Sequence, residues 1–340
     1  MHPKSFRQLH FKSPWQCKEV HQQLPDSLPS DCALLRVESC TFCGSDSDAL
    51  GSALSDWTAL GHEICATVVA IGAQSIANVR IDDLVAVELS TMCGNCPDCR
   101  GAMVDRCDRC LPLSLDCYGG FAEYIIVLSK ALWTLPGKLR TIGSLVQPLA
   151  ACIDVLHLAK IRTGSSVAII GCGPIALMLC FLALRLGASR VECYARAGND
   201  VRLGLANSMG AKTFVIPDDN TKWSSNVSDC TINTAPFSSI PSAVELTRYG
   251  GIVVNIGIGS GEQMTILDCQ KFHWRRLTLA SAFARPSLYF SEAISILQNH
   301  TETFEKFISH RFHLDQVEDA MKLLRQSKRS TVKVALTRED

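Results

Sequence analysis

The 340-residue chain lacks several features that would assign it to large classes of protein. No run of about 18 consecutive apolar residues occurs, so we expect no membrane-spanning helix. The segment MHPKSFRQLHFKSPWQ at the N-terminus lacks the apolar core of a signal peptide. The formal net charge is zero, which disfavours nucleic acid or an anionic membrane surface as a partner. These absences predict a cytoplasmic protein.

Cysteine is abundant, with 17 residues spread along the chain. Such a number would indicate a disulfide scaffold in a small secreted domain, but many of these cysteines lie in apolar runs of a long chain, so reduced thiols and bound metal are favoured. Four of them, in the run CGNCPDCRGAMVDRC, have spacings that suit one tetrahedral zinc ion. They are Cys93, Cys96, Cys99 and Cys107. A shell of four thiolates leaves no open coordination position, so it predicts a structural site. Cys110 and Cys117 follow closely and leave an alternative ligand open.

Two further motifs flank this cluster. Upstream, CGSD at residues 43–46 and GHE at residues 61–63 supply a thiolate, an imidazole and a carboxylate, which together can hold zinc with one position free for water or substrate. The alternative is a packed core thiol and an ordinary turn. Downstream, SVAIIGCGPIAL at residues 166–177 runs from a strand through a glycine-rich turn into a helix, a pattern that binds a dinucleotide pyrophosphate. Gly171 and Gly173 permit the tight turn, and Ala176 occupies the third position.

The length predicts two domains. Up to about residue 152, short apolar segments separated by Gly, Pro and Asp predict an all-β domain. From Ser165 onward strands alternate with helices, which requires a parallel sheet. The strand-like segments are 32–40, 64–72, 84–89, 121–127, 253–257 and 277–281, and the amphipathic stretches 287–299 and 315–326 predict helices.

This order of motifs resembles the zinc-containing medium-chain dehydrogenase/reductase family, in its branch of polyol, sugar and secondary-alcohol dehydrogenases. Further stretches that support the resemblance are residues 61–74, 118–124, 147–157, 248–257 and 309–321, whereas the first forty residues match poorly. The resemblance implies a GroES-like catalytic β domain and a Rossmann domain with a doubly wound parallel sheet. The expected bounds are 1–152 and 285–340 for the catalytic domain, about 90–112 for its zinc lobe, and 153–284 for the Rossmann domain.

The resemblance also implies the roles of the zinc residues. Cys43, His62 and Glu63 would bind a catalytic zinc ion, which acts as a Lewis acid while the nicotinamide transfers hydride. The cluster of four cysteines, with Cys107 at the family's spacing, would bind a second, structural zinc. Ser45 would pass the hydroxyl proton toward solvent.

Three departures from the family pattern affect the catalytic site. Gln147 stands in QPLA where many members have Glu, so the negative charge near the zinc is absent. Asp48 stands where many members have a relay His, so we expect a different proton exit. The segment between Cys43 and His62 is also short, which affects the substrate-pocket loop.

The cofactor preference rests on the end of the second Rossmann strand. An acidic residue there normally binds the adenosine ribose, whereas this chain has Ala195 followed by Arg196. The loss of the anion and the gain of a guanidinium favour NADP(H) over NAD(H). Arg202 adds to this pocket, and Asp200 is the residue that would restore binding of an unphosphorylated ribose. Other expected cofactor contacts are Pro174, Ile175, Asn233 and Ile256.

The resulting hypothesis is a zinc-dependent oxidoreductase that interconverts a secondary alcohol and a ketone on a polyol, sugar, cyclitol or similar small molecule. The resemblance implies a homodimer or homotetramer. The alternative is a catalytically impaired homologue that keeps the cofactor as a redox-sensing or binding module, to which Gln147 and Asp48 point. A zinc-independent quinone-type reductase is disfavoured by GHE and the four cysteines.

Overall fold

The computed structural model describes residues 4–75, 78–113, 119–216, 227–259, 264–327 and 329–338. The chain forms two compact units. Unit 1 comprises Met1–Ala150, Ala284–Ser327 and Lys333–Asp340, and unit 2 comprises Ala151–Phe283 and Lys328–Val332. The family resemblance places residues 285–340 wholly in the first domain, whereas the short segment Lys328–Val332 belongs to unit 2.

The main sheet of unit 1 has the order β10-β6-β5-β3-β18-β17, and β9 also pairs with β3. Its strands are β3 (Cys32–Thr41), β5 (Glu63–Ile71), β6 (Leu84–Val87), β9 (Tyr124–Leu128), β10 (Leu132–Thr134), β17 (Ile308–His313) and β18 (Lys333–Thr337). The predicted apolar segments of the first half all contribute strands to it. Phe121 lies in the core of this unit, stacked on Phe42 and edge-on to Phe11.

The first forty residues, which show no clear family likeness, nevertheless form regular structure. Strands β1 (Ser5–Lys12) and β2 (Gln16–Gln23) form a hairpin, and β4 (Thr58–Ala59) pairs with the other edge of β1. Strand β1 buries Phe6 and Gln8 on one face and Leu9 and Phe11 on the other, because successive side chains of a strand point to opposite faces. The hairpin therefore contributes apolar side chains to the core of unit 1.

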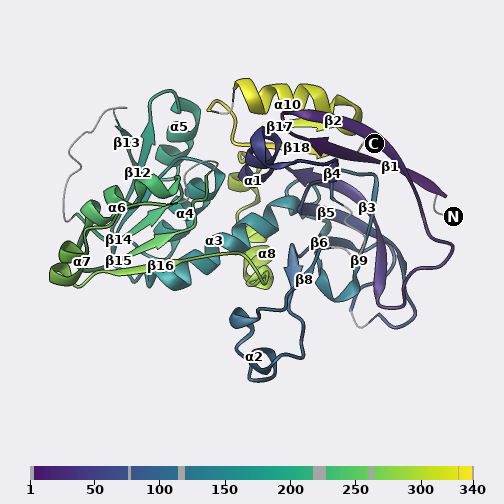
Figure 1. Ribbon diagram of the computed structural model, residues 1–340, viewed down its shortest axis with the longest axis horizontal. Helices are drawn as coiled ribbons and strands as arrows, with labels where there is room; N and C mark the ends of the chain where they lie inside the picture. The colour runs from purple at the N-terminus through teal and green to yellow at the C-terminus, as the bar shows by residue number, and fades with distance from the viewer. Residues whose placement is uncertain are drawn as a thin grey trace. The chain divides into compact units, whose positions relative to one another are not determined.

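The predicted zinc lobe is a projecting loop of unit 1 (Figure 1). It contains β7 (Ser90–Thr91), the single-turn helix α2 (Pro97–Arg100) and β8 (Leu111–Pro112). The other helices of this unit are α1 (Gly44–Asp48), α8 (Phe290–Asn299), α9 (Thr301–Glu305) and α10 (Val317–Gln326). Helix α3 (Val146–Ala159) begins in unit 1 and ends in unit 2.

Unit 2 is a six-stranded, all-parallel sheet of order β13-β12-β11-β14-β15-β16. The strands are β11 (Ser166–Ile170), β12 (Arg190–Arg196), β13 (Lys212–Ile216), β14 (Ser228–Asn233), β15 (Thr247–Asn255) and β16 (Thr278–Ser281). The helices are α4 (Pro174–Arg185), α5 (Asp200–Ser208), α6 (Ile240–Leu246) and α7 (Cys269–Arg275). Counted from β11, this is the doubly wound dinucleotide-binding order, which confirms the predicted fold class. Within the described ranges no helix is long and apolar enough to cross a membrane.

Candidate metal centres and dinucleotide site

The structure brings the three expected catalytic zinc ligands together at one end of the β3–β5 ladder. Thr41 and Glu63 are register partners in this antiparallel pair, so the residues just beyond β3 meet those just before β5. Cys43 precedes the first residue of α1, and His62 precedes β5. The sulfur, nitrogen and oxygen ligand atoms of Cys43, His62 and Glu63 all lie within 4.8 Å of one another.

Gly61 fixes the turn that presents His62. Its φ is +98°, and an added Cβ would lie 2.8 Å from the backbone nitrogen of Phe121 and 2.9 Å from Sγ of Cys40. Glycine is therefore required both by the backbone angle and by the close approach of residue 121. The short GHE motif thus contains one positioning residue beside two candidate ligands.

Glu63 is held by a buried cation. Nζ of Lys333 donates to both carboxylate oxygens of Glu63, and the Thr41 hydroxyl donates to one of them. Lys333 also donates to the carbonyl of Phe42 at 3.3 Å. Burial alone would lower the pKa of Lys333, but Glu63 and its neighbours raise it, so the lysine remains charged. The carboxylate is thus oriented and neutralised by residues from β3 and β18.

His62 is oriented by Asp46 of α1. The buried Asp46 carboxylate accepts a hydrogen bond from the backbone N–H of Cys43 at 2.8 Å, and its Oδ1 lies 3.6 Å from Nδ1 of His62. Burial by itself would lower the pKa of His62, but Asp46, Cys43 and Glu63 raise it to about 10. A metal ion at this place would therefore have to displace a proton from the imidazole.

The donor set and its charges fit a zinc ion. Zinc bonds of about 2.0–2.3 Å place tetrahedral donors roughly 3.3–3.8 Å apart, which is compatible with three ligand atoms that all lie within 4.8 Å of one another. A Cys43 thiolate with the Asp46 and Glu63 carboxylates would balance one divalent ion plus Lys333. Buried charges need such compensation.

The other residues expected near this centre are placed less directly. Ser45 lies in α1, two residues after Cys43 and half-buried, and Asp48 ends the same helix. Gln147 is buried in the first turn of α3. In the part of the chain that the structure describes, the Gln147 amide makes no hydrogen bond to the three candidate ligands.

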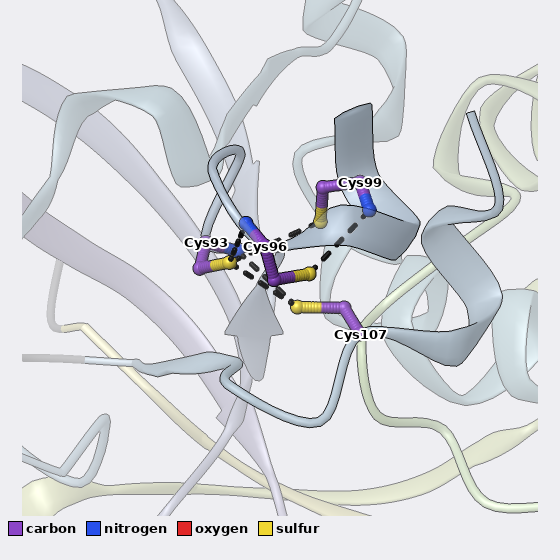
Figure 2. A group of neighbouring side chains, drawn as sticks. All are labelled: Cys93, Cys96, Cys99 and Cys107. Atoms are coloured by element: carbon purple, nitrogen blue, oxygen red, sulfur yellow. Dashed lines mark hydrogen bonds between the residues drawn. The ribbon is translucent and has the colours of Figure 1, made fainter. Parts of the chain in front are cut away.

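The four cysteines of the lobe converge on one point, as Figure 2 shows. All four sulfur atoms lie within 4.8 Å of one another; Sγ of Cys93 is 3.7 Å from that of Cys107 and 4.0 Å from that of Cys99. Four thiolates about 2.3 Å from a tetrahedral zinc ion would be separated by roughly 3.8 Å. The lobe therefore matches the dimensions of a closed zinc site.

Backbone N–H groups of the lobe point at these sulfur atoms. The amides of Cys96, Cys99 and Cys93 donate to the sulfurs of Cys93, Cys96 and Cys107 at 3.4, 3.4 and 3.5 Å. The amide of Cys93 is the main cause that lowers the pKa of Cys107 to about 6. Cys110 instead donates to the carbonyl of Cys107, and Cys117 lies outside the described residues.

The glycine-rich turn of unit 2 links β11 to α4. Gly171 has φ +106°, and an added Cβ would lie 2.2 Å from Oγ1 of Thr234. Gly173 has open space around it, and Pro174 begins the helix with no side chain capping its N-terminus. The first N–H groups of α4 thus have no side-chain cap, as pyrophosphate binding at a helix N-terminus requires.

The later strands end beside this turn. The Thr234 hydroxyl donates to the carbonyl of Ile170. The buried side-chain amide N–H of Asn233 donates to the side-chain oxygen of Asn255 at 2.8 Å. Ile256 follows β15 and bonds through its N–H to the carbonyl of Asn233 at 3.0 Å. These two predicted cofactor positions therefore lie at the carboxyl ends of neighbouring parallel strands, where α/β proteins bind ligands.

Two exposed arginines flank the turn after β12. Ala195 is buried and Arg196 is exposed. NH1 of Arg329 donates to the carbonyl of Ala197 at 2.8 Å. The side-chain amide of Asn199 donates to the backbone carbonyl of Arg196. Arg329 reaches this turn because the segment Lys328–Val332 packs with unit 2.

Arg202, expected to face the same pocket, is largely buried. Its Nε donates to the carbonyl of Thr331 at 2.6 Å, and desolvation lowers the pKa of this arginine. Arg202 thus ties α5 to the C-terminal segment. Glu192, within β12, accepts a hydrogen bond from the Tyr194 hydroxyl.

Four residues around these sites are assigned no role by the sequence analysis. They are Thr41, Asp46, Lys333 and Arg329. Asp46 belongs to CGSD and could have been found from its place one helical turn after Cys43. Lys333 and Arg329 could not, because each meets its partner across more than a hundred residues of chain.

Comparison with known proteins finds similarity to dehydrogenases. Residues 29–137 match the family described as alcohol dehydrogenase GroES-like domain. An L-threonine 3-dehydrogenase of Caldanaerobacter subterraneus is 32% identical over a match that spans 58% of each chain. A sorbitol dehydrogenase of Bombyx mori is 26% identical over 86% of this chain and 88% of its own. The alcohol dehydrogenase TADH of Thermus sp. ATN1 superimposes with a TM-score of 0.86 at 25% identity, covering 98% of this chain and 100% of its own.

A GroES-like β domain and a Rossmann domain, with four clustered cysteines in the first, are the features that this chain has in common with dehydrogenase-type oxidoreductases. The matching GroES-like domain, the dehydrogenase relatives and the superimposed solved structure support the zinc-containing medium-chain dehydrogenase/reductase family. The predicted family and fold class are thereby confirmed.

Proposed function

We propose that the protein is a zinc-dependent dehydrogenase that interconverts a secondary alcohol and a ketone on a polyol, sugar, cyclitol or similar small molecule. The observation that carries the proposal is the group of one sulfur, one nitrogen and one oxygen donor at the end of the β3–β5 ladder, in which Glu63 is buried and Cys43 and His62 are half-buried. Similarity to a sorbitol dehydrogenase and an L-threonine 3-dehydrogenase supports a small hydroxylated substrate.

Each residue of this group has a distinct task. Cys43, His62 and Glu63 would hold the zinc ion, which when bound supplies a Lewis acid for the alcohol or carbonyl oxygen. Asp46 orients the imidazole, and Lys333 fixes the position of the Glu63 carboxylate. The Ser45 hydroxyl would relay the proton of the substrate alcohol toward solvent, accepting it on oxygen as it releases its own proton.

Substitution of the thiolate tests zinc catalysis. Cys43→Ser should abolish turnover, reduce the zinc content from two ions per chain to one and leave cofactor affinity near normal. Cys269→Ser, which changes an exposed thiol of unit 2, is the matched control and should keep full activity. Retained turnover in Cys43→Ser would exclude this site as the reaction centre. A wild-type chain with one zinc, tight cofactor binding and no turnover on a panel of polyols, sugars, cyclitols and simple secondary alcohols would favour the redox-sensing module.

We further propose that the enzyme prefers NADP(H). The buried Ala195 leaves no carboxylate at the end of β12, and the exposed guanidinium groups of Arg196 and Arg329 flank the following turn. A ribose 2′-phosphate carries the charge that guanidinium groups bind best. Arg202 donates a hydrogen bond to the carbonyl of Thr331 and so helps to hold the segment that carries Arg329.

The test compares kcat/KM for the two nicotinamides. Arg196→Asp should shift the preference toward NAD(H) by more than tenfold, and Arg329→Gln should shift it in the same direction by less. Arg276→Gln, an exposed arginine elsewhere in unit 2, should leave the ratio unchanged. An unaltered ratio in Arg196→Asp would reject the ribose-pocket assignment while leaving the zinc proposal intact.

The remaining proposals concern assembly and location. We expect a homodimer or homotetramer in the cytoplasm, where the free thiols of the described residues stay reduced. Sedimentation of the purified chain measures its oligomeric state directly.

A further inference from the structure

Strand β3 changes its partner along one edge. Arg36 is the last residue of β3 that pairs with β9, opposite Tyr124, and Ser39 is the first that pairs with β18, opposite Thr337. Both partners run antiparallel to β3, so β18 ends where β9 begins. Neither strand continues across the intervening residues, and the sheet is interrupted there.

A cavity of about 440 Å³ opens at this interruption, wholly within unit 1. Its volume falls in the range of roughly 300–1,000 Å³ that is typical of small-molecule sites. Part of its lining is apolar and comes from Val37, Leu314 and Leu336. The backbone groups at the break are bonded, since Val37 N–H donates to the carbonyl of residue 123 and Arg338 N–H donates to that of residue 38. The cavity is therefore a formed feature of the sheet edge.

The charged lining of this cavity is mainly basic. It contains Arg7, Arg36 and Arg338 but a single carboxylate, Glu123. Glu123 is already engaged, because it accepts hydrogen bonds at 2.8 Å from both the backbone N–H and Nε of Arg7. The pair is neutral, so the positive charge of the other two arginines is uncompensated by the lining itself.

Arg36 has one carboxylate neighbour outside the cavity lining, Glu38, and it shares this carboxylate with Arg140. Its Nε and NH2 donate to Oε1 of Glu38, and NH1 of Arg140 lies 2.9 Å from the other oxygen. Burial of Glu38 would raise its pKa, but hydrogen bonds from Thr67 and Arg36 lower it, so the group is ionised at neutral pH. The single negative charge of Glu38 balances only one of the two arginines, so the group keeps a net charge of about +1.

Arg338 provides the second positive charge. It follows β18, its side chain is exposed at the cavity, and the structure records no ion pair for its guanidinium among the described residues. A planar guanidinium presents several N–H donors whose geometry matches a carboxylate or phosphate. Its donors are thus available to a ligand at the cavity mouth.

We propose that this cavity binds a small organic anion, whose phosphate or carboxylate group contacts Arg36 and Arg338 and whose carbon skeleton packs on Val37, Leu314 and Leu336. The site is separate from the Cys43, His62 and Glu63 group. On β18, Lys333 points to Glu63, whereas Leu336 is three residues on and therefore faces the opposite side of the strand.

Calorimetric titration with phenyl phosphate, benzoate and inorganic phosphate tests the proposal on the full chain. The protein is first saturated with nicotinamide cofactor, so that anions cannot occupy the dinucleotide site. We expect one molecule of phenyl phosphate or benzoate to bind per chain. The probe with the higher affinity shows whether the cavity prefers a phosphate or a carboxylate group. Inorganic phosphate, which has no carbon skeleton, should bind more weakly than phenyl phosphate.

Two substitutions assign the binding to this cavity. Arg338→Gln should lower the affinity for the preferred ligand by roughly tenfold, the loss expected for a hydrogen bond to a charged group. Arg36→Gln should lower this affinity by a similar factor. Arg80→Gln removes an exposed arginine elsewhere in unit 1 and should change affinity by less than twofold. Because Arg338 has no ion pair to lose among the described residues, its variant should fold normally, which circular dichroism checks. Absence of binding by all three probes, or equal affinity in wild type and Arg338→Gln, would overturn the assignment.

Discussion

In the metal-free protein, Lys333→Met leaves the Glu63 carboxylate buried without a cation. The two side chains are 3% and 1% exposed, so water cannot replace the lost partner. Breaking a buried ion pair by removal of one member costs about 3–5 kcal/mol, because the remaining charge keeps its full desolvation penalty. The Thr41 hydroxyl still donates to Glu63, which places the expected cost near the lower end, at about 3 kcal/mol.

The expected loss is large enough to measure by thermal unfolding. For a unit of this size each kcal/mol changes Tm by about 2–4 °C, so the transition of unit 1 should fall by roughly 6–12 °C. Lys306→Met, which removes an exposed lysine of the same unit, should change Tm by less than about 2 °C.

A second variant separates the buried charge from the loss of packing. Adding Glu63→Gln to Lys333→Met removes both charges, so the double variant should recover a large part of the lost stability. If Lys333→Met cost less than about 1 kcal/mol, or if the double variant were less stable than the single one, the account of Glu63 as a carboxylate neutralised by Lys333 would be wrong.

Three other variants give independent expectations. Cys107→Ser removes one thiolate of the lobe, so zinc content should fall by one ion per chain and amide exchange should accelerate across residues 90–112; unchanged metal content would contradict the four-cysteine site. Gly171→Ala places a Cβ 2.2 Å from Oγ1 of Thr234 at φ +106°, so unit 2 should lose about 1–3 kcal/mol. Gly204→Ala has open space around it and should cost nothing, and equal Tm values for the two would refute the steric argument. Glu38→Gln tests the pH dependence: hydrogen bonds lower the pKa of Glu38 in the folded chain, so its stabilisation is present above about pH 4.5 and disappears as pH falls through the lowered value. The stability gap between wild type and Glu38→Gln should therefore shrink on acidification, and a gap that widened would show the opposite sign.

Much of the architecture could be predicted because its signals are local. The spacing of the four cysteines, the strand–turn–helix pattern around Gly171 and the alternation of strands with helices after residue 165 each depend on neighbours in the chain. The N-terminal hairpin is the clearest omission. Its strands β1 and β2 alternate weakly in the sequence and are stabilised by pairing and by burial of Phe6 and Phe11 in unit 1.

The sequence by itself determined which residues are candidates for metal and cofactor chemistry, because the proposed ligands of each site are only a few residues apart or recur in motifs. Tertiary structure decided how those residues are charged and supported. Lys333 reaches Glu63 across 270 residues, Arg329 reaches the turn after β12 across 132, and the cavity beside Arg338 exists because two distant strands share one edge of β3. No local pattern specifies such contacts, since they arise only when separate segments pack together and exclude water from the charges between them.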